Sequence, residues 1–135
     1  MSDKKVIKVG VIGAGRIGKI HAETLATRVP GAVVEAIADV NVAAAQELAE
    51  KLHIPHVYSD YKKIMADPAI DAVAICSSTN THADLMIEAA AAGKHIFCEK
   101  PVDHSLAKID AAIAAVKKAG VKCQIGFNRR FDPNF

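Results

Sequence analysis

The strongest constraint on the fold is a regular alternation of two sequence patterns from one end of the chain to the other. Short runs rich in Val, Ile and Ala alternate with longer segments in which apolar residues recur every three or four positions. This alternation is typical of βαβ units, which build a parallel sheet with helices on both faces. The length of 135 residues suits one domain with a single core. We therefore predict an α/β fold in which residues 1–135 form one three-layer domain.

Six apolar runs are expected to be the strands of this sheet. They cover residues 6–12, 33–38, 56–58, 72–76, 95–98 and 122–127. Strands that are apolar on both sides belong inside a sheet that helices cover on both faces. In a six-stranded doubly wound sheet the strand order is 3-2-1-4-5-6, and the ligand crevice lies between the first and fourth strands at their carboxyl ends. The sequence therefore predicts a Rossmann fold with its site at this edge.

Helices are expected between the strands. Their buried faces are predicted from apolar spacing at Ile17, Ile20 and Leu25 in the first helix and at Leu106, Ile109, Ile113 and Val116 in the last. Thr81 with Asp84 three residues later predicts a capping box at the start of the fourth predicted helix. Gly93 and Gly120 are expected to end helices.

A glycine-rich motif follows the first predicted strand. Residues 13–18 read Gly-Ala-Gly-Arg-Ile-Gly, and Asp39 lies 21 positions after Gly18, at the end of the next strand. This arrangement matches the dinucleotide-binding fingerprint. We expect Gly13 to permit the tight turn, Gly15 to let a pyrophosphate approach, and Gly18 to pack the helix closely. Arg16 and Ile17 lie at the helix start, whose free N–H groups and dipole can hold phosphates. A glycine-rich turn without a ligand is the alternative.

Asp39 indicates which dinucleotide is bound. Its carboxylate can accept hydrogen bonds from the adenosine ribose hydroxyls, and it would repel the additional phosphate of NADP. The next residues, Val40 and Asn41, offer no cation for that phosphate. NAD is therefore the expected cofactor, while NADP stays as the alternative because Arg16 could compensate. A helix cap or loop carboxylate is the alternative role of Asp39.

Polar residues follow the fourth predicted strand. Ser77, Ser78, Asn80 and His82 lie beside the predicted crevice and are expected to contact the cofactor. The same residue types are common in turns of any function, so only their position favours a binding role. Of the six histidines, His82 alone has a functional case, and His21 is expected on a helix surface.

Two further motifs follow the fifth and sixth strands. Glu99-Lys100-Pro101 places an ammonium at the crevice, where it could stabilise a developing alkoxide or carry a proton. A solvated surface lysine is the alternative, and the cis or trans state before Pro101 stays open. Arg129 follows the last strand and could bind a polar substrate, or it could simply be surface charge.

Together these motifs resemble the glucose-fructose oxidoreductase and inositol dehydrogenase family, especially its inositol dehydrogenases. The similarity runs over nearly the whole chain, and the Glu-Lys-Pro motif and residues 126–132 are its most specific parts. The resemblance implies an NAD-dependent oxidoreductase that transfers hydride between NAD and a CH–OH group of a polyol or sugar. It also implies the following roles: Lys100 is catalytic, Asp39 binds ribose, Ser77, Asn80 and His82 belong to the cofactor loop, and Arg129 lies near the substrate.

Members of this family continue into a substrate domain that supplies an Asp and a general-base His. We expect the present chain to lack that domain, to bind NAD(H) with little or no turnover, and to take a substrate only when the domain is supplied. One alternative is a stand-alone dinucleotide sensor that acts through a partner. Another is a structural domain that forms a homodimer through the exposed edge of its last strand.

Composition argues against several other classes. The net charge of +2 comes from 17 basic and 15 acidic residues without a long basic run, which does not favour nucleic-acid binding. No apolar stretch is long enough to span a bilayer and no signal peptide is recognised, so a cytoplasmic location is expected. Cys76, Cys98 and Cys123 are widely spaced, and we expect free, buried thiols rather than a metal site.

Overall fold

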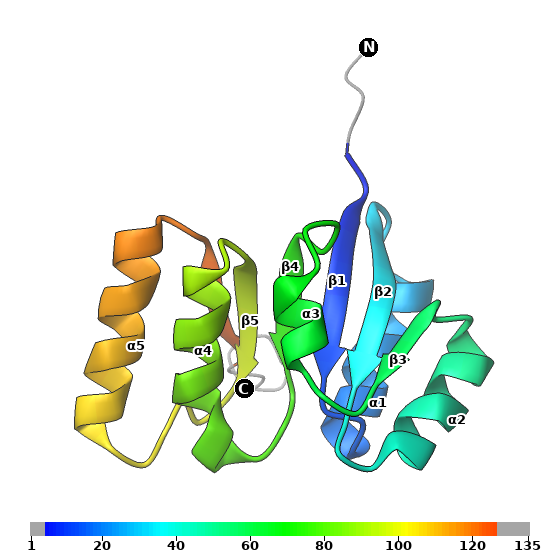
Figure 1. Ribbon diagram of the computed structural model, residues 1–135, viewed down its shortest axis with the longest axis horizontal. Helices are drawn as coiled ribbons and strands as arrows, with labels where there is room; N and C mark the ends of the chain where they lie inside the picture. Colours follow the sequence, from blue (N-terminus) through cyan, green and yellow to red (C-terminus); the bar gives the residue numbers. More distant parts are fainter. Residues whose placement is uncertain (1–4, 127–135) are drawn as a thin grey trace, which may run out of the picture.

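Six parallel strands form one sheet in the computed structural model, which describes residues 5–126 (Figure 1). The strands are β1 (Ile7–Ile12), β2 (Ala32–Ala38), β3 (His56–Tyr58), β4 (Ala72–Ile75), β5 (His95–Glu99) and β6 (Cys123–Gly126). Their order is β3-β2-β1-β4-β5-β6, and each neighbouring pair is parallel. The predicted doubly wound Rossmann fold is thus confirmed, with strand ends shifted by one residue at several places.

Helices cover both faces of the sheet. They are α1 (Arg16–Thr27), α2 (Val42–Leu52), α3 (Lys62–Ala66), α4 (His82–Ala91) and α5 (Leu106–Ala119), with a short 3-10 helix η1 (Thr79–Thr81) before α4. One core cluster joins α1 and α2 to β1 and β2, and a second joins α3, α4 and α5 to β4 and β5. The crossovers therefore pass to opposite faces on the two sides of the β1–β4 boundary, which opens a crevice there.

Small residues bring α1 close to the sheet. Its buried positions are Gly18 and Ala22, and a Cβ atom on Gly18 would lie 1.9 Å from the Gly13 carbonyl oxygen. Ile17 and Ile20 are 41% and 50% exposed. The predicted stripe through these two isoleucines is therefore wrong, because large side chains do not fit where helix and strand backbones approach so closely.

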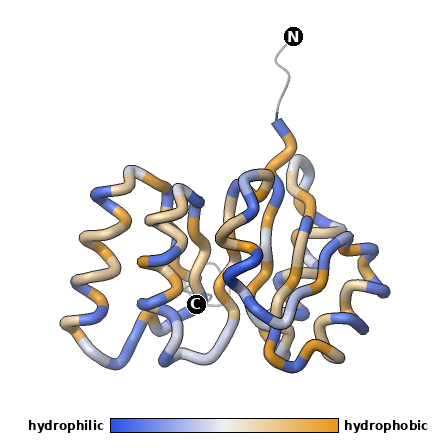
Figure 2. Tube along the Cα trace, viewed as in Figure 1, coloured by the Kyte–Doolittle hydropathy of each residue, from blue (hydrophilic) through white to orange (hydrophobic). Residues whose placement is uncertain are grey.

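The buried face of α5 also differs from the prediction. Ala112 is the buried residue of this helix, while Leu106 and Ile113 are 78% and 45% exposed. Figure 1 shows α5 on the outer side of α4, so only a narrow strip of α5 is covered. In Figure 2 polar and apolar residues alternate along α5, as expected for a helix with one wet side.

Glycines end the helices as predicted, but the capping box at α4 is absent. Gly93 and Gly120 have positive φ angles of 74° and 70°, which L-residues with a Cβ rarely adopt. Thr81 occupies the N-cap position of α4 without a side-chain capping bond. Its hydroxyl donates instead to the Ser78 carbonyl oxygen at 2.6 Å. The capping-box prediction is wrong because Thr81 has helical φ and ψ angles of −100° and −14°, whereas a residue whose side chain caps a helix start is typically extended.

The three thiols are free and differ in burial. Cys98 is buried and Cys76 is half-buried, and burial raises the pKa of both thiols to about 12. Cys123 is exposed, so the prediction of a buried thiol is wrong there. The reason is that β6 is the edge strand of the sheet. Within residues 5–126, every helix is too short or too polar to cross a membrane.

Candidate cofactor-binding site

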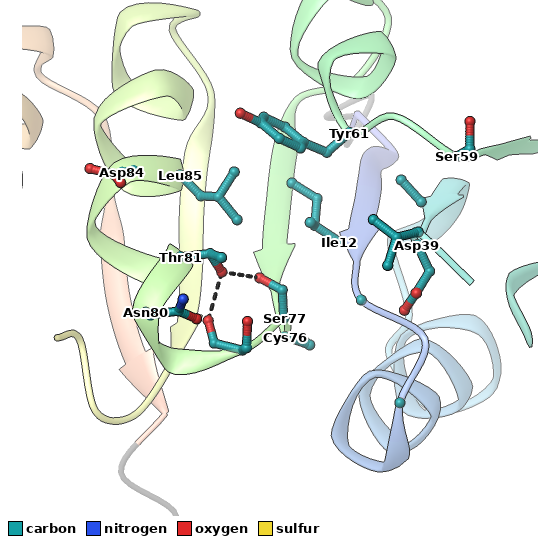
Figure 3. Close-up of a pocket in the computed structure, with 15 residues that line it drawn as sticks. Ile12, Asp39, Ser59, Tyr61, Cys76, Ser77, Asn80, Thr81, Asp84 and Leu85 are labelled. Atoms are coloured by element: carbon teal, nitrogen blue, oxygen red, sulfur yellow. Dashed lines mark hydrogen bonds between the residues drawn. The ribbon is translucent and has the colours of Figure 1, made fainter. Parts of the chain in front are cut away.

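A cavity of about 640 Å³ opens at the carboxyl ends of β1 and β4, where the crevice was predicted (Figure 3). It is lined by Ile12, Gly13, Gly15, Ala38, Asp39, Val40, Ser59, Tyr61, Cys76, Ser77, Ser78, Asn80, Thr81, Asp84 and Leu85. In Figure 3 the Asp39 side chain lies on one side of this space and the Ser77–Thr81 group on the other. The structure thus brings the glycine loop, Asp39 and the loop after β4 to one site.

The first two glycines of the motif have different structural roles in the loop. Gly13 has a φ angle of +109°, and a Cβ there would lie 2.7 Å from the Cys76 carbonyl. Gly13 therefore permits both the turn and the close approach of β4. Gly15 has an ordinary φ of −76°, and a Cβ built on it would meet nothing within 4 Å. The open space beside Gly15 is where a ligand could approach the backbone.

The amino end of α1 faces this open space. Gly15 is the N-cap residue, and no side-chain hydrogen bond caps this end in the part of the chain that the structure describes. The N–H groups of the first turn are therefore available to an anion, which the helix dipole also attracts. Arg16 is the exposed first residue of the helix and adds a positive charge next to it.

Asp39 ties the glycine loop to the turn after β2. One carboxylate oxygen accepts from the Ala14 N–H at 2.6 Å, and the other accepts from the Asn41 N–H at 2.7 Å. The N-cap of α2 is Asn41, whose side chain accepts from the Ala44 N–H at 3.3 Å. Asp39 therefore does not cap that helix. A carboxylate has about four acceptor positions, so further acceptors stay free for ligand hydroxyls.

Hydroxyl groups shape the opposite wall of the cavity. The Ser77 and Thr81 hydroxyl oxygens lie 2.7 Å apart, and Thr81 donates its proton to the Ser78 carbonyl (Figure 3). Ser77 must then be the donor to Thr81, because a hydroxyl has only one proton. The Ser77 oxygen keeps acceptor capacity toward the cavity. Asn80 lies nearby with an exposed side chain.

His82 lies behind this wall and does not line the cavity. Its side chain is 2% exposed, and its two ring nitrogens lie 2.8 Å from the Pro101 and Ser77 carbonyl oxygens. Contact between His82 and a cofactor stays a prediction. What the structure shows is a buried ring between the loops that follow β4 and β5.

The Glu-Lys-Pro motif lies at the same edge of the sheet but outside the cavity wall. β5 ends at Glu99, Lys100 is exposed, and the peptide bond before Pro101 is cis. Arg129, the predicted substrate residue, lies outside the described residues. The catalytic prediction for Lys100 therefore stays untested by the geometry.

Glu99 has a partner that the sequence did not reveal. It hydrogen-bonds to His21 of α1, whose ring packs edge-on against Phe97 with centroids 5.0 Å apart. His21 is half-buried, so its predicted place on a helix surface is wrong. It lies three residues after Gly18, and this spacing was the available signal that it shares the sheet-facing side of α1.

Several cavity residues were not predicted, among them Ser59, Tyr61, Asp84 and Leu85. In Figure 3 the side chains of Tyr61 and Leu85 both lie above Ser77 in the view. The Tyr61 hydroxyl donates to the Glu88 carboxylate at 2.5 Å, and this hydrogen bond is the main reason that the pKa of Tyr61 rises to about 12. Tyr61 lies shortly after the end of β3, and this position after a strand end was the sequence signal that it could line the site.

The two glycines at the start of α1 predict opposite effects of one added methyl group. Gly18→Ala forces a methyl against the Gly13 carbonyl and should cost about 3 kcal/mol of unfolding free energy or more. Gly15→Ala should change stability by only about 0.5 kcal/mol, because the space is open, yet weaken NADH binding at least about tenfold. Urea unfolding and NADH fluorescence titration measure the two effects. Unchanged NADH binding by Gly15→Ala would contradict the assignment of this space.

Known proteins match both the sequence and the fold. A family model described as an oxidoreductase family with an NAD-binding Rossmann fold matches residues 7–127. The myo-inositol 2-dehydrogenase of Thermotoga maritima is 50% identical over 129 residues, which cover 96% of this chain and 38% of that protein. The scyllo-inositol 2-dehydrogenase (NAD(+)) of Bacillus subtilis is 44% identical over 129 residues, with coverage of 96% and 38%.

A solved structure gives the same result. Scyllo-inositol dehydrogenase from Lactobacillus casei, with bound NAD(H) and scyllo-inositol, superposes with a TM-score of 0.91 at 35% identity. The match covers 96% of this chain and 38% of that one. The chain thus spans about 38% of the length of the relatives it matches. It belongs to the glucose-fructose oxidoreductase and inositol dehydrogenase family, and residues 7–127 match its NAD-binding Rossmann fold.

Proposed function

We propose that the chain binds NAD(H) across the crevice, with the adenosine ribose at Asp39 and the nicotinamide toward β5. The observation that carries this proposal is the Asp39 carboxylate in the cavity wall, next to the open space at Gly15. A ribose needs acceptors for two hydroxyls, and a pyrophosphate needs N–H donors at close range. The residues present fit both parts of the dinucleotide.

NAD(H) is preferred over NADP(H) in this proposal. A 2′-phosphate would lie against the Asp39 carboxylate, and like charges at such a distance repel. The residues of the described chain that line the cavity include neither Lys nor Arg. Arg16 at the start of α1 is exposed and could offset only part of this repulsion.

A titration with both dinucleotides tests this preference. The unmodified chain should bind NADH at least about tenfold more tightly than NADPH, as followed by nucleotide fluorescence. Asp39→Asn removes the charge but keeps only one of the two oxygens that accept from the Ala14 and Asn41 N–H groups. Both dinucleotides should therefore bind more weakly, and the preference should shrink because NADH loses more affinity than NADPH. If neither dinucleotide binds at millimolar concentration, or if Asp39→Asn leaves the preference unchanged, the proposal is wrong.

We further propose that residues 1–135 are the cofactor domain of an enzyme that oxidises a CH–OH group of a polyol or sugar in the cytoplasm. NAD would accept the hydride from the substrate carbon. Lys100, exposed at the end of β5, would donate a hydrogen bond to the substrate oxygen and stabilise its negative charge as the proton leaves. By the family resemblance, the proton passes to a His of a substrate domain, and Arg129 lies near the substrate. The inositol dehydrogenase relatives support this substrate class.

Turnover with an added substrate domain tests the role of Lys100. The chain should be fused to the segment of the Thermotoga maritima relative that lies beyond the matched region, and myo-inositol-dependent formation of NADH should be measured. Lys100→Met should lower kcat by about a hundredfold or more while the Kd for NADH changes little. Equal kcat values for the fusion and its Lys100→Met variant would refute the catalytic assignment.

We also propose that two copies can associate through the β6 edge. β6 is the last strand of the sheet, with Cys123 and Gln124 exposed. Beside it a groove of about 570 Å³, walled by α1, includes Leu25, Val29 and Phe97. An edge that no other strand of residues 5–126 pairs with, next to apolar surface, favours pairing with another chain.

Light scattering over a concentration series tests this association. The apparent mass should rise toward that of a dimer as concentration increases. Gln124→Lys places a charge at the edge of each copy and should shift the midpoint to higher concentration, whereas Gln46→Lys on α2 makes the same charge change away from β6 and should not. A constant monomer mass, or equal shifts by both variants, would contradict the proposal.

A further inference from the structure

A buried ring joins the two loops that border the nicotinamide end of the proposed site. His82 is the first residue of α4, and its side chain is 2% exposed. One ring nitrogen, Nε2, lies 2.8 Å from the Ser77 carbonyl oxygen in the loop after β4. The other, Nδ1, lies 2.8 Å from the Pro101 carbonyl oxygen in the loop after β5.

The two partners of His82 are of one chemical kind. A carbonyl oxygen only accepts hydrogen bonds, and a neutral imidazole has a single N–H, so both bonds form together only in the imidazolium form, which carries a positive charge and a proton on each ring nitrogen. A side chain that donates in two directions acts as a cross-link between the two backbone segments. Loss of either bond would leave a partly buried carbonyl without this donor, which is unfavourable.

One linked segment lines the cavity and the other carries the proposed catalytic residue. Ser77 is in the cavity wall, and Pro101 directly follows Lys100 at the same edge of the sheet. Asn80, also in the cavity wall, lies between Ser77 and His82. Movement of the Pro101 loop away from the Ser77 loop would therefore carry Lys100 away from the cavity, while the glycine loop and Asp39 would stay in place.

We infer that His82 is a positioning residue that donates from both ring nitrogens and holds the Lys100 segment at a fixed distance from the Ser77 wall. The inference rests on the proposed dinucleotide binding and assigns His82 to the nicotinamide end of that site. His82 lies behind the cavity wall, so this role replaces the cofactor contact that the sequence predicted for it. It acts through the two carbonyl groups that it binds.

The chain contains a matched control for this arrangement. The buried polar side chains among residues 5–126 are His82 and Lys94. The Lys94 ammonium also donates to two carbonyl oxygens, those of Asp67 and Ile70, each at 2.7 Å. It does so at the opposite edge of the sheet, before the start of β5. Lys94→Met therefore removes an equivalent two-carbonyl link far from the site.

Binding of NADH and of ADP-ribose separates the two ends of the site, because ADP-ribose lacks the nicotinamide. His82→Phe keeps a buried ring and removes both donors. We expect this variant to bind ADP-ribose within about twofold of the unmodified chain, and to bind NADH about tenfold more weakly with loss of the nicotinamide fluorescence enhancement. Lys94→Met should lower the Tm but leave the ratio of the two Kd values unchanged. An unchanged ratio in His82→Phe, or an equal change in Lys94→Met, would overturn the inference.

A second measurement does not depend on cofactor binding or on the folding of a variant. Nitrogen-15 NMR of the unmodified chain distinguishes ring nitrogens that carry a proton from those with a lone pair. Two protonated, slowly exchanging nitrogens in His82 are the expected result, and a lone pair on either nitrogen overturns the inference. If the unmodified chain binds neither NADH nor ADP-ribose, the proposed function fails, and the NMR result still decides whether the double link exists.

Discussion

The contact between Gly18 and the Gly13 carbonyl is the constraint on which the rest of the structure depends. It lets α1 start directly against the end of β1, so the N–H groups of its first turn point into the crevice between β1 and β4. A larger residue at either position would move the helix outward. The site for an anion would move with it, and the close approach of β4 at Cys76 would be lost.

The two walls of the crevice are held by different kinds of bond. On the β2 side, a carboxylate collects backbone N–H groups, because Asp39 accepts from Ala14 and Asn41. On the β4 and β5 side, the two ring nitrogens of His82 hydrogen-bond to the carbonyl oxygens of Ser77 and Pro101 and so bridge the two loops. In each wall one side chain therefore forms hydrogen bonds to backbone groups of two segments: an acceptor binds N–H groups in one wall, and a donor binds carbonyl groups in the other. Such satisfied polar groups keep loops in place at a cavity edge, where little apolar packing is available.

The sequence predicted those features that depend on local pattern. Strand order, the glycine loop and the position of Asp39 follow from alternation and spacing, and the structure confirms them. Features that depend on proximity in space were missed. The bond between His21 and Glu99 joins residues 78 positions apart, and no local pattern announces it. The exposed Ile20 shows the second cause of error, since a helix that packs through small residues turns its large ones outward.

In the proposed site one carboxylate would have two tasks, because Asp39 holds the glycine loop and would also repel the 2′-phosphate of NADP(H). Changing selectivity toward a phosphorylated dinucleotide requires loss of the negative charge. The same substitution would also remove an acceptor for the Ala14 and Asn41 N–H groups, and so loosen the loop that is proposed to hold the pyrophosphate. A single exchange of Asp39 for a cationic residue would therefore disrupt the loop that binds the dinucleotide as well as change the selectivity. A viable route first needs a neighbouring residue that accepts these two hydrogen bonds, so the switch takes more than one mutational step.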